Sequence, residues 1–186
     1  MISFKIKVFA LFLCCVAGYS YISSLSQDIA LSINQQSYQA NYFIEGSQTK
    51  RFTVEGKLES ILNAKTLEHY EDIHVTLFEK PHITFFSQKE NSGWIIHAEE
   101  GILNHDNNMI LLEQQVTLIS SRSQDPIQSL KTSTLDLNYD TMIAHSSERV
   151  NLIGQNLTLS GTGLFADLEE EHIYLQQEIQ GVYENK

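Results

Sequence analysis

The sequence contains little cysteine, and this excludes several kinds of chemistry. Only two cysteines occur among the 186 residues, Cys14 and Cys15, and both lie in an apolar stretch near the N-terminus. The chain after Cys15 therefore holds no disulfide bond, no thiolate nucleophile and no thiolate metal ligand. Its stability has to come from side-chain packing and hydrogen bonding.

Basic residues are also few, since the chain has 12 Lys and Arg against 23 Asp and Glu and a formal net charge of −11. Without Lys5 and Lys7 at the N-terminus, the balance is 10 − 23 = −13. Proteins that bind nucleic acid need clustered cations, so this composition excludes that function. The hydrophobic content of 42% is that of a globular protein rather than a disordered one.

Known catalytic and cofactor motifs are missing as well, since the sequence has no G-x-S-x-G, H-E-x-x-H, phosphate-binding loop or G-x-G-x-x-G. The seven histidines lack the i,i+2 and i,i+4 spacings of metal ligands, and we interpret them as residues of the surface or of a groove edge. The acidic runs at 99–100 and 169–171 are interpreted as a solvated rim, in preference to an acid/base pair or a Ca²⁺ site. We predict no enzyme activity, no metal site and no cofactor.

A long uncharged stretch is present near the N-terminus. Residues 8–25 contain no charged side chain, and about 17–25 apolar residues span a bilayer as a helix. Lys5 and Lys7 orient the N-terminus toward the cytoplasm. We predict a cytoplasmic end at 1–7, a transmembrane anchor at 8–25, a linker at 26–37 and an exported domain at 38–186. The alternative is a cleaved signal peptide, with Val16 and Gly18 as the small residues of the processing site.

The chain after Tyr38 is made of short runs rich in Val, Ile, Thr, Phe and Tyr, which favour strands. The runs begin at 52, 73, 82, 94, 109, 116, 135, 150, 157 and 179. Segments rich in Asn, Asp, Ser and Gly separate them, as in turns. Only two prolines occur, and no helical period persists for three turns. We therefore predict an all-β fold.

An internal repeat of 19 residues is visible in the later part of the chain. Copies at 98–116, 132–150 and 161–179 have Leu-Asn, Leu-Asn and Ala-Asp at the same offset (103–104, 137–138 and 166–167), and a looser copy at 57–75 has Leu62-Asn63 there. We predict that each copy is a strand, a tight turn centred on Asn or Asp, a second strand and a short corner into a third. Stacked copies would form a long, twisted pair of sheets, because each copy contacts mainly its neighbours.

One run, MILL at 109–112, is apolar on both faces, whereas a half-buried strand alternates. HITFF at 82–86 has a similar character. Two interpretations are open. Either the sheets separate along one side and the inner face continues into an open apolar groove, or the run spans a bulge or corner where the facing direction switches.

Two longer segments carry a resemblance to a known family. HYEDIHVTLFEKPHITFF at 69–86 and WIIHAEEGILNHDNNMILLEQQVTLI at 94–119 resemble the LptC family of lipopolysaccharide-transport proteins of Gram-negative bacteria. The segment LTLSGTGLFADLEEEHIYLQQEIQGVYE at 157–184 also fits. One position departs from the pattern, because Asn156 stands where some members have glycine. The matched positions are Phe78 with Pro81, Trp94 with Ala98, and Leu112 with Val116 and Leu118.

The resemblance implies a single-pass inner-membrane protein whose periplasmic domain is a twisted, boat-shaped β-jellyroll of stacked antiparallel strands. Such a protein receives lipopolysaccharide from the inner-membrane ABC transporter complex. It passes the lipid to a periplasmic bridge protein of related fold through edge-to-edge strand contact. Phe78 and Tyr183 are the positions carried over as lipid-facing. The full set of expected lipid-facing residues is Phe78, Phe85, Ile110, Leu112, Ile173 and Tyr183, and the expected partner edge strand contains Ile179, Gly181 and Val182.

Three functions are compared on this basis. The first is a component that carries lipopolysaccharide by its acyl chains, since burial of a CH₂ is worth about 0.8 kcal/mol and an acidic domain is a poor host for an anionic head group. The second is an anchored scaffold that recruits a partner by strand addition and never contacts lipid. The third is a periplasmic hydrolase, against which the lack of motifs counts. Direction of transport would come from ATP hydrolysis in the partner complex, because this chain has no nucleotide motif.

Overall fold

The computed structural model describes residues 39–87 and 92–183. The predicted cytoplasmic end, anchor and linker all lie outside the described residues. No helix within the described ranges has the length and apolar character needed to cross a membrane. The strands all belong to one compact unit of the chain, Ala40–Lys186.

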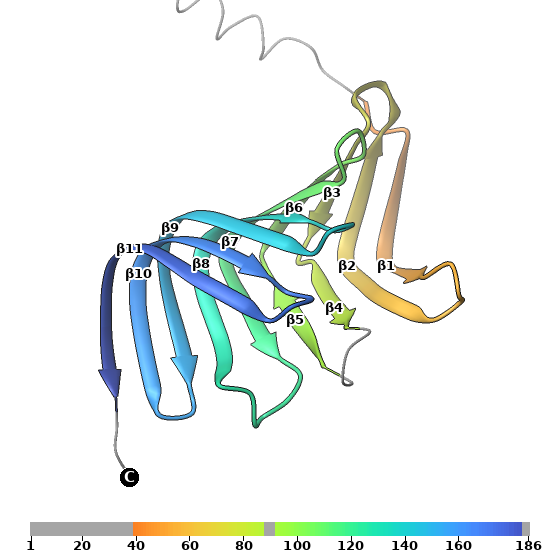
Figure 1. Ribbon diagram of the computed structural model, residues 1–186. Helices are drawn as coiled ribbons and strands as arrows, with labels where there is room; N and C mark the ends of the chain where they lie inside the picture. Colours follow the sequence, from red (N-terminus) through yellow and green to blue (C-terminus); the bar gives the residue numbers. More distant parts are fainter. Residues whose placement is uncertain (1–38, 88–91, 184–186) are drawn as a thin grey trace, which may run out of the picture. The chain divides into compact units, whose positions relative to one another are not determined.

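The prediction of an all-β fold is confirmed. Within residues 39–87 and 92–183 the chain forms eleven strands and one short 3₁₀ turn, Glu71–Ile73. All strands pair antiparallel in one sheet, with the order β11-β10-β9-β8-β7-β5-β4-β2-β3-β6, and β1 pairs with β2 (Figure 1). The strands are β1 (Tyr42–Phe52), β2 (Leu58–Tyr70), β3 (Val75–Glu79), β4 (His82–Phe86), β5 (Gly93–His97), β6 (Glu100–Asn104), β7 (Met109–Ser120), β8 (Ile127–Asn138), β9 (Ile143–Gly154), β10 (Leu157–Asp167) and β11 (His172–Tyr183).

The single sheet bends into two walls, and β7 shows how. Residues 109–113 of β7 pair with β6, whereas residues 117–120 pair with β5. β2 divides in the same way, since residues 66–70 pair with β3 and residues 60–63 pair with β4. We call the layer that contains β3 and β6 the β3–β6 wall, and the layer that contains β4 and β5 the β4–β5 wall. The predicted pair of sheets is one continuous sheet, because the long strands run through both walls.

Backbone irregularities mark the bend in the long strands. Gln114 and Gln115 in β7 have φ angles of 61° and 56°, Gly163 in β10 has 80°, and Glu178 in β11 has 51°. The pairing register shifts beside each of these positions, as it does at β-bulges, which bend a strand and increase its twist. The predicted corner into a third strand is therefore a bulge within one strand.

The three clear copies of the repeat are hairpins closed by the same hydrogen bond. In each, the side-chain oxygen of the Asn or Asp that ends the first strand accepts the backbone N–H two residues later: Asp106 N to Asn104 at 2.9 Å, Asp140 N to Asn138 at 3.0 Å, and Glu169 N to Asp167 at 3.1 Å. This is the local side-chain bond expected of a turn Asn or Asp. Four positions after that residue, each turn has a positive φ, at Asn108, Met142 and Glu171. The turn prediction is confirmed for these copies.

The looser copy at 57–75 is not a hairpin, and that part of the prediction is wrong. Asn63 lies in the middle of β2, where its side chain accepts a hydrogen bond from Gln48 Nε2 at 2.9 Å across the strand pair. The strand expected to begin at Phe52 is also wrong, since Phe52 ends β1 and residues 53–57 turn into β2. The long pair of β1 and β2 carries few apolar runs, which is why sequence patterns did not indicate it.

The side chains of the MILL run alternate between the two faces of the sheet without a switch. Ile110 and Leu112 are buried, whereas Met109 and Leu111 are half-buried on the opposite face. The bulge at Gln114 and Gln115 follows the run and does not interrupt it. The interpretation of MILL as a corner is therefore wrong.

The interior between the walls is filled by alternate side chains of the long strands. Those with no more than 2% of their surface exposed include Ile96, Leu112, Val116, Leu118, Leu130, Leu135, Leu137, Val150, Leu152, Leu164 and Leu168. Most belong to β7, β8, β9 and β10. Packing is therefore closest in the later part of the sheet, and the strands near β1 leave more room.

Candidate functional site

A cavity of about 370 Å³ lies between the walls beside β1 and β2. Residues from both walls line it: β4 and β5 contribute from one wall, and β6, the first half of β7 and the end of β8 from the other. This volume is within the range of small-molecule sites, about 300–1,000 Å³. The apolar lining residues are Leu62, Ile83, Phe85, Ile96, Leu103, Ile110, Leu137 and Met142.

The polar lining residues come mainly from β1, β2 and the ends of β6 and β8. Among the described residues, the lining contains two cations, Lys50 and Arg51, and no carboxylate. Lys50 and Arg51 are neighbours on a strand, so their side chains leave opposite faces. Arg51 lies opposite Ser60, another lining residue, and is the cation that the alternation places on the inner face.

Arg51 joins β1 to the turn between β8 and β9. Its Nε lies 2.7 Å from Glu59 Oε2, and its Nη2 lies 2.8 Å from Asp140 Oδ1. Its Nη1 donates to the backbone oxygen of Tyr139 at 3.1 Å, and the guanidinium carbon is 4.9 Å from the centre of the Tyr139 ring. We call these four residues the Arg51 clasp. The clasp connects the two walls beside the cavity.

Two further lining groups are held in their neutral forms. Burial lowers the pKa of His105, and the nearby His69 and His74 lower it further. Its Nε2 lies 2.8 Å from Thr76 Oγ1. Burial also raises the pKa of Tyr139, whose hydroxyl donates to Asn108 Oδ1 at 2.7 Å. At neutral pH these two side chains therefore add no charge to the cavity.

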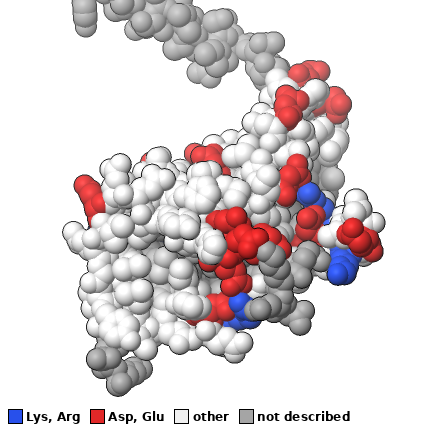
Figure 2. Space-filling model, in the orientation of Figure 1, with Lys and Arg blue, Asp and Glu red and all other residues white. Residues whose placement is uncertain are grey.

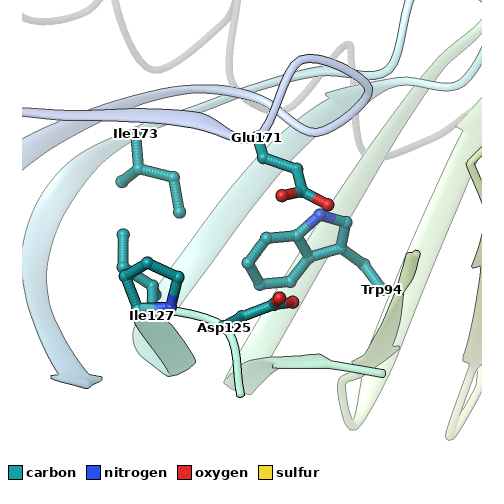
Figure 3. Close-up of a pocket in the computed structure, with 6 residues that line it drawn as sticks. Trp94, Asp125, Ile127, Glu171 and Ile173 are labelled. Carbon is teal, nitrogen blue, oxygen red and sulfur yellow. The ribbon is translucent and has the colours of Figure 1, made fainter. Parts of the chain in front are cut away.

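A second, smaller pocket of about 120 Å³ lies beside Trp94 (Figure 3). The indole ring of Trp94 lies between Glu171 and Asp125, and its Nε1 donates to the backbone oxygen of Leu168 at 3.2 Å. Arg122 binds Asp125 through Nε at 2.8 Å and both carboxylate oxygens of Glu171 through Nη2 at 3.0 Å. We call Arg122, Asp125 and Glu171 the Arg122 clasp. It also connects the two walls, but over an interior that the Trp94 side chain fills.

The structure brings two of the predicted lipid-facing residues into the cavity. Phe85 and Ile110 line it from opposite walls. Leu112 is fully buried in the main core, and Phe78 is buried with Ala64 and Leu67 in a smaller cluster. Neither of these two is among the lining residues of the cavity.

The remaining predicted lipid-facing residues lie away from the cavity. Ile173 lines the small pocket beside Trp94. Tyr183 is the last residue of β11, and 66% of its surface is exposed. The predicted partner residues Ile179, Gly181 and Val182 are on the same strand and are exposed. Within the described residues β11 pairs with β10 alone, so its outer edge is free for another strand.

Several site residues were not found from the sequence. Leu103 and Leu137 are the leucines of the repeated Leu-Asn pairs, and each points into the cavity just before its turn. The repeat therefore held a signal for them. Arg51 had none, because its wall-to-wall partners are 88 and more positions away along the chain.

Within residues 39–87 and 92–183, no group of three or more His, Cys, Asp or Glu side chains is placed so that it could hold a metal ion. His82 and His97 form a pair, with ring centres 4.3 Å apart. Burial and the neighbouring His82 lower the pKa of His97. The two rings meet edge to face on the adjacent strands β4 and β5.

The family model described as lipopolysaccharide-assembly, LptC-related, matches residues 8–184, which include every described strand. No curated protein matches the sequence.

Proposed function

The chain belongs to the LptC-related family of lipopolysaccharide-assembly proteins, and from this membership we propose that its β unit carries lipopolysaccharide by holding acyl chains in the cavity beside β1 and β2. The family places the chain in lipopolysaccharide transport within the cell envelope, as a transport component. The observation that supports the finer proposal is the cavity itself, which is mostly apolar, opens between two walls and has no carboxylate among its described lining residues.

The physical argument favours the acyl chains as the part of the lipid that is held. Each buried CH₂ contributes about 0.8 kcal/mol, and the eight apolar side chains of the lining offer the surface for it. The head group of lipopolysaccharide carries phosphates, and the exported part of the chain has an excess of acidic residues. Acidic side chains gather near the middle of the face shown in Figure 2. The head group is therefore expected to stay in solvent at the mouth of the cavity.

Transfer to other proteins is proposed to use the ends of the sheet. β1 and β11 each pair with a single strand among those described, and each carries exposed apolar side chains. A free edge can accept a strand from another protein. We propose that the β11 edge, with Ile179, Gly181 and Val182, docks the periplasmic bridge protein. The β1 edge is then left for the inner-membrane ABC transporter complex.

The remaining parts of the proposal concern the location and the type of fold. We propose that residues 8–25 anchor the chain in the inner membrane and that residues 38–186 lie in the periplasm. The bent sheet with two walls and an opening between them supports a boat-shaped β-jellyroll. A chain of this kind makes and breaks no covalent bond, and the energy for transport comes from its partners.

Photo-crosslinking in cells tests lipid binding. A photo-crosslinking residue at Leu62, which lines the cavity and is partly buried, should form adducts with lipopolysaccharide. The same residue at Lys131, which is exposed and does not line the cavity, is the matched control and should form none. Adducts with protein alone at Leu62 would reject the carrier and support the scaffold, which the exposed sheet edges also suit.

A further inference from the structure

The two clasps join the same walls but enclose different interiors. The Arg122 clasp lies over Trp94, 4% of whose surface is exposed, and over a pocket of about 120 Å³. The Arg51 clasp lies beside the cavity of about 370 Å³. Only the second clasp therefore restrains a space that a ligand can enter.

We infer that the Arg51 clasp determines how many hydrocarbon chains the cavity accepts, which makes Arg51 a specificity-determining residue of the transport site. With the clasp closed, the cavity takes one hydrocarbon chain. With the clasp open, the walls separate and a lipid with several chains enters. This inference rests on the proposed function.

The size of the cavity supports a limit of one chain. Its volume lies near the lower end of the range for small-molecule sites, about 300–1,000 Å³. Lipopolysaccharide carries several acyl chains on one head group. A larger space requires the β3–β6 wall to move away from the β4–β5 wall, and the close packing of the interior from β7 to β10 leaves no spare room there.

The Arg51 clasp is placed to resist that movement and is weak enough to release. It joins β1 and β2, through Arg51 and Glu59, to the turn after β8, through Tyr139 and Asp140. The side chains of Arg51 and Asp140 are 33% and 42% exposed, and ion pairs in contact with water contribute little stability.

An anionic cargo also has a direct means of opening the clasp. A guanidinium binds phosphate through two parallel hydrogen bonds as well as it binds a carboxylate. A phosphate at the mouth competes with Asp140 for Arg51.

Energy transfer from Trp94 provides a readout of cavity occupancy. Trp94 is the single tryptophan of the chain, and it pairs across strands with Phe85, which lines the cavity. The full chain in lipid nanodiscs is titrated with dansyl-undecanoic acid, a fluorescent single-chain amphiphile. Purified lipopolysaccharide is then added to displace it, and empty nanodiscs correct for partition into the bilayer.

The variants separate chain number from general affinity. In Arg51→Ala, lipopolysaccharide should displace the probe at about tenfold lower concentration if the open state of the wild type holds about a tenth of the molecules. The affinity for the single-chain probe should change by less than about twofold, because one chain already fits. Lys65→Ala removes a more exposed ion pair, with Glu79, within one wall and should change neither value.

A second, more conservative variant tests the same contact in case Arg51→Ala disturbs folding. Asp140→Asn removes the ion pair between the walls and leaves the Arg51 side chain in place. It should also lower the lipopolysaccharide concentration that displaces the probe, but by a smaller factor. The inference would be overturned if the affinities for the probe and for lipopolysaccharide changed by the same factor. It would also be overturned if the affinity for lipopolysaccharide changed in neither variant. If lipopolysaccharide displaces the probe equally well in all variants and labels Leu62 in cells, the proposed function stands and the inference fails. If the probe binds and lipopolysaccharide neither displaces it nor labels Leu62, the proposed function itself fails.

Discussion

At the residue scale, a leucine in the core and a leucine that lines the cavity contribute differently to stability. Leu135 has no exposed surface and belongs to the main core, whereas Leu62 packs at its border and lines the cavity. Removal of a sealed leucine leaves a new cavity in close packing. Removal of Leu62 enlarges a space that already exists.

We therefore predict that Leu135→Ala lowers the free energy of unfolding by about 2–5 kcal/mol, and that Leu62→Ala lowers it by clearly less. Urea denaturation of the full chain, followed by the fluorescence of Trp94, measures both. Equal losses would mean that the space beside Leu62 closes in solution, and the cavity would then be an incorrect description of the site.

Individual residues were predictable from sequence where the physical cause is local. The turn roles of Asn104, Asn138 and Asp167 follow from side chains that bond to backbone two residues later. The burial of Phe85 and Ile110 follows from apolar strands. Arg51 was not predictable, because its role depends on Asp140, which approaches only after the sheet has bent.

At the element scale, the hairpins of the repeat owe their closure to one side chain each. Asn138 Oδ1 accepts the backbone N–H groups of Asp140 and Thr141, both at 3.0 Å. The chain offers a matched control, because Leu62-Asn63 has the same dipeptide in the middle of β2. There the asparagine side chain accepts a hydrogen bond from the exposed side chain of Gln48.

Asn138→Ala should therefore lower the free energy of unfolding by about 1–2 kcal/mol, since two turn hydrogen bonds are lost. Asn63→Ala should lower it by less, because Asn63 is half-buried in β2 and loses one hydrogen bond, to the exposed side chain of Gln48. Thermal unfolding of the two variants provides the comparison. A larger loss for Asn63 would show that the turn bonds do not close the hairpin.

Elements were predictable where apolar residues alternate and were missed where they do not. The strands β3, β4 and β5 coincide with expected runs to within two residues. The pair of β1 and β2 was missed, because its residues are mostly polar or half-buried and both β1 faces are largely exposed. Sequence patterns detect burial, and β1 is held mainly by its backbone pairing with β2.

At the scale of the whole molecule, the end of β11 contributes little to the packed interior. Residues 176–183 are all exposed, and none belongs to the core. They pair with residues 157–162 of β10, which retains β9 on its other side. The sheet therefore loses an edge but no interior packing when they are removed.

We predict that deletion of residues 178–186 abolishes binding of the periplasmic bridge protein and leaves the β unit folded. Deletion of 184–186 alone retains all of β11 and is the control, which should bind normally. Pull-down with the bridge protein and circular dichroism measure the two properties. Undiminished binding by the shorter chain would place the contact on another edge.

The general architecture was only partly predictable. Strand type and hairpin repeat are consequences of local pattern, and both appear in the structure. That one sheet makes both walls depends on bulges at Gln114, Gln115 and Glu178. Glutamine and glutamate carry no signal for positive φ, so the sequence pattern predicted a pair of sheets where the chain forms one.

Because β7 to β11 pass without a break from one wall to the other, the walls cannot slide past each other or come apart in parallel. The relative motion left to them is rotation about the line of bulges, with the bulged residues as the axis. The displacement in such a rotation is zero at the axis and greatest at the free margins. In the proposed function, the ends of the acyl chains would therefore lie near the axis. The hydrated head group would lie at the margin, where a small rotation opens the widest gap.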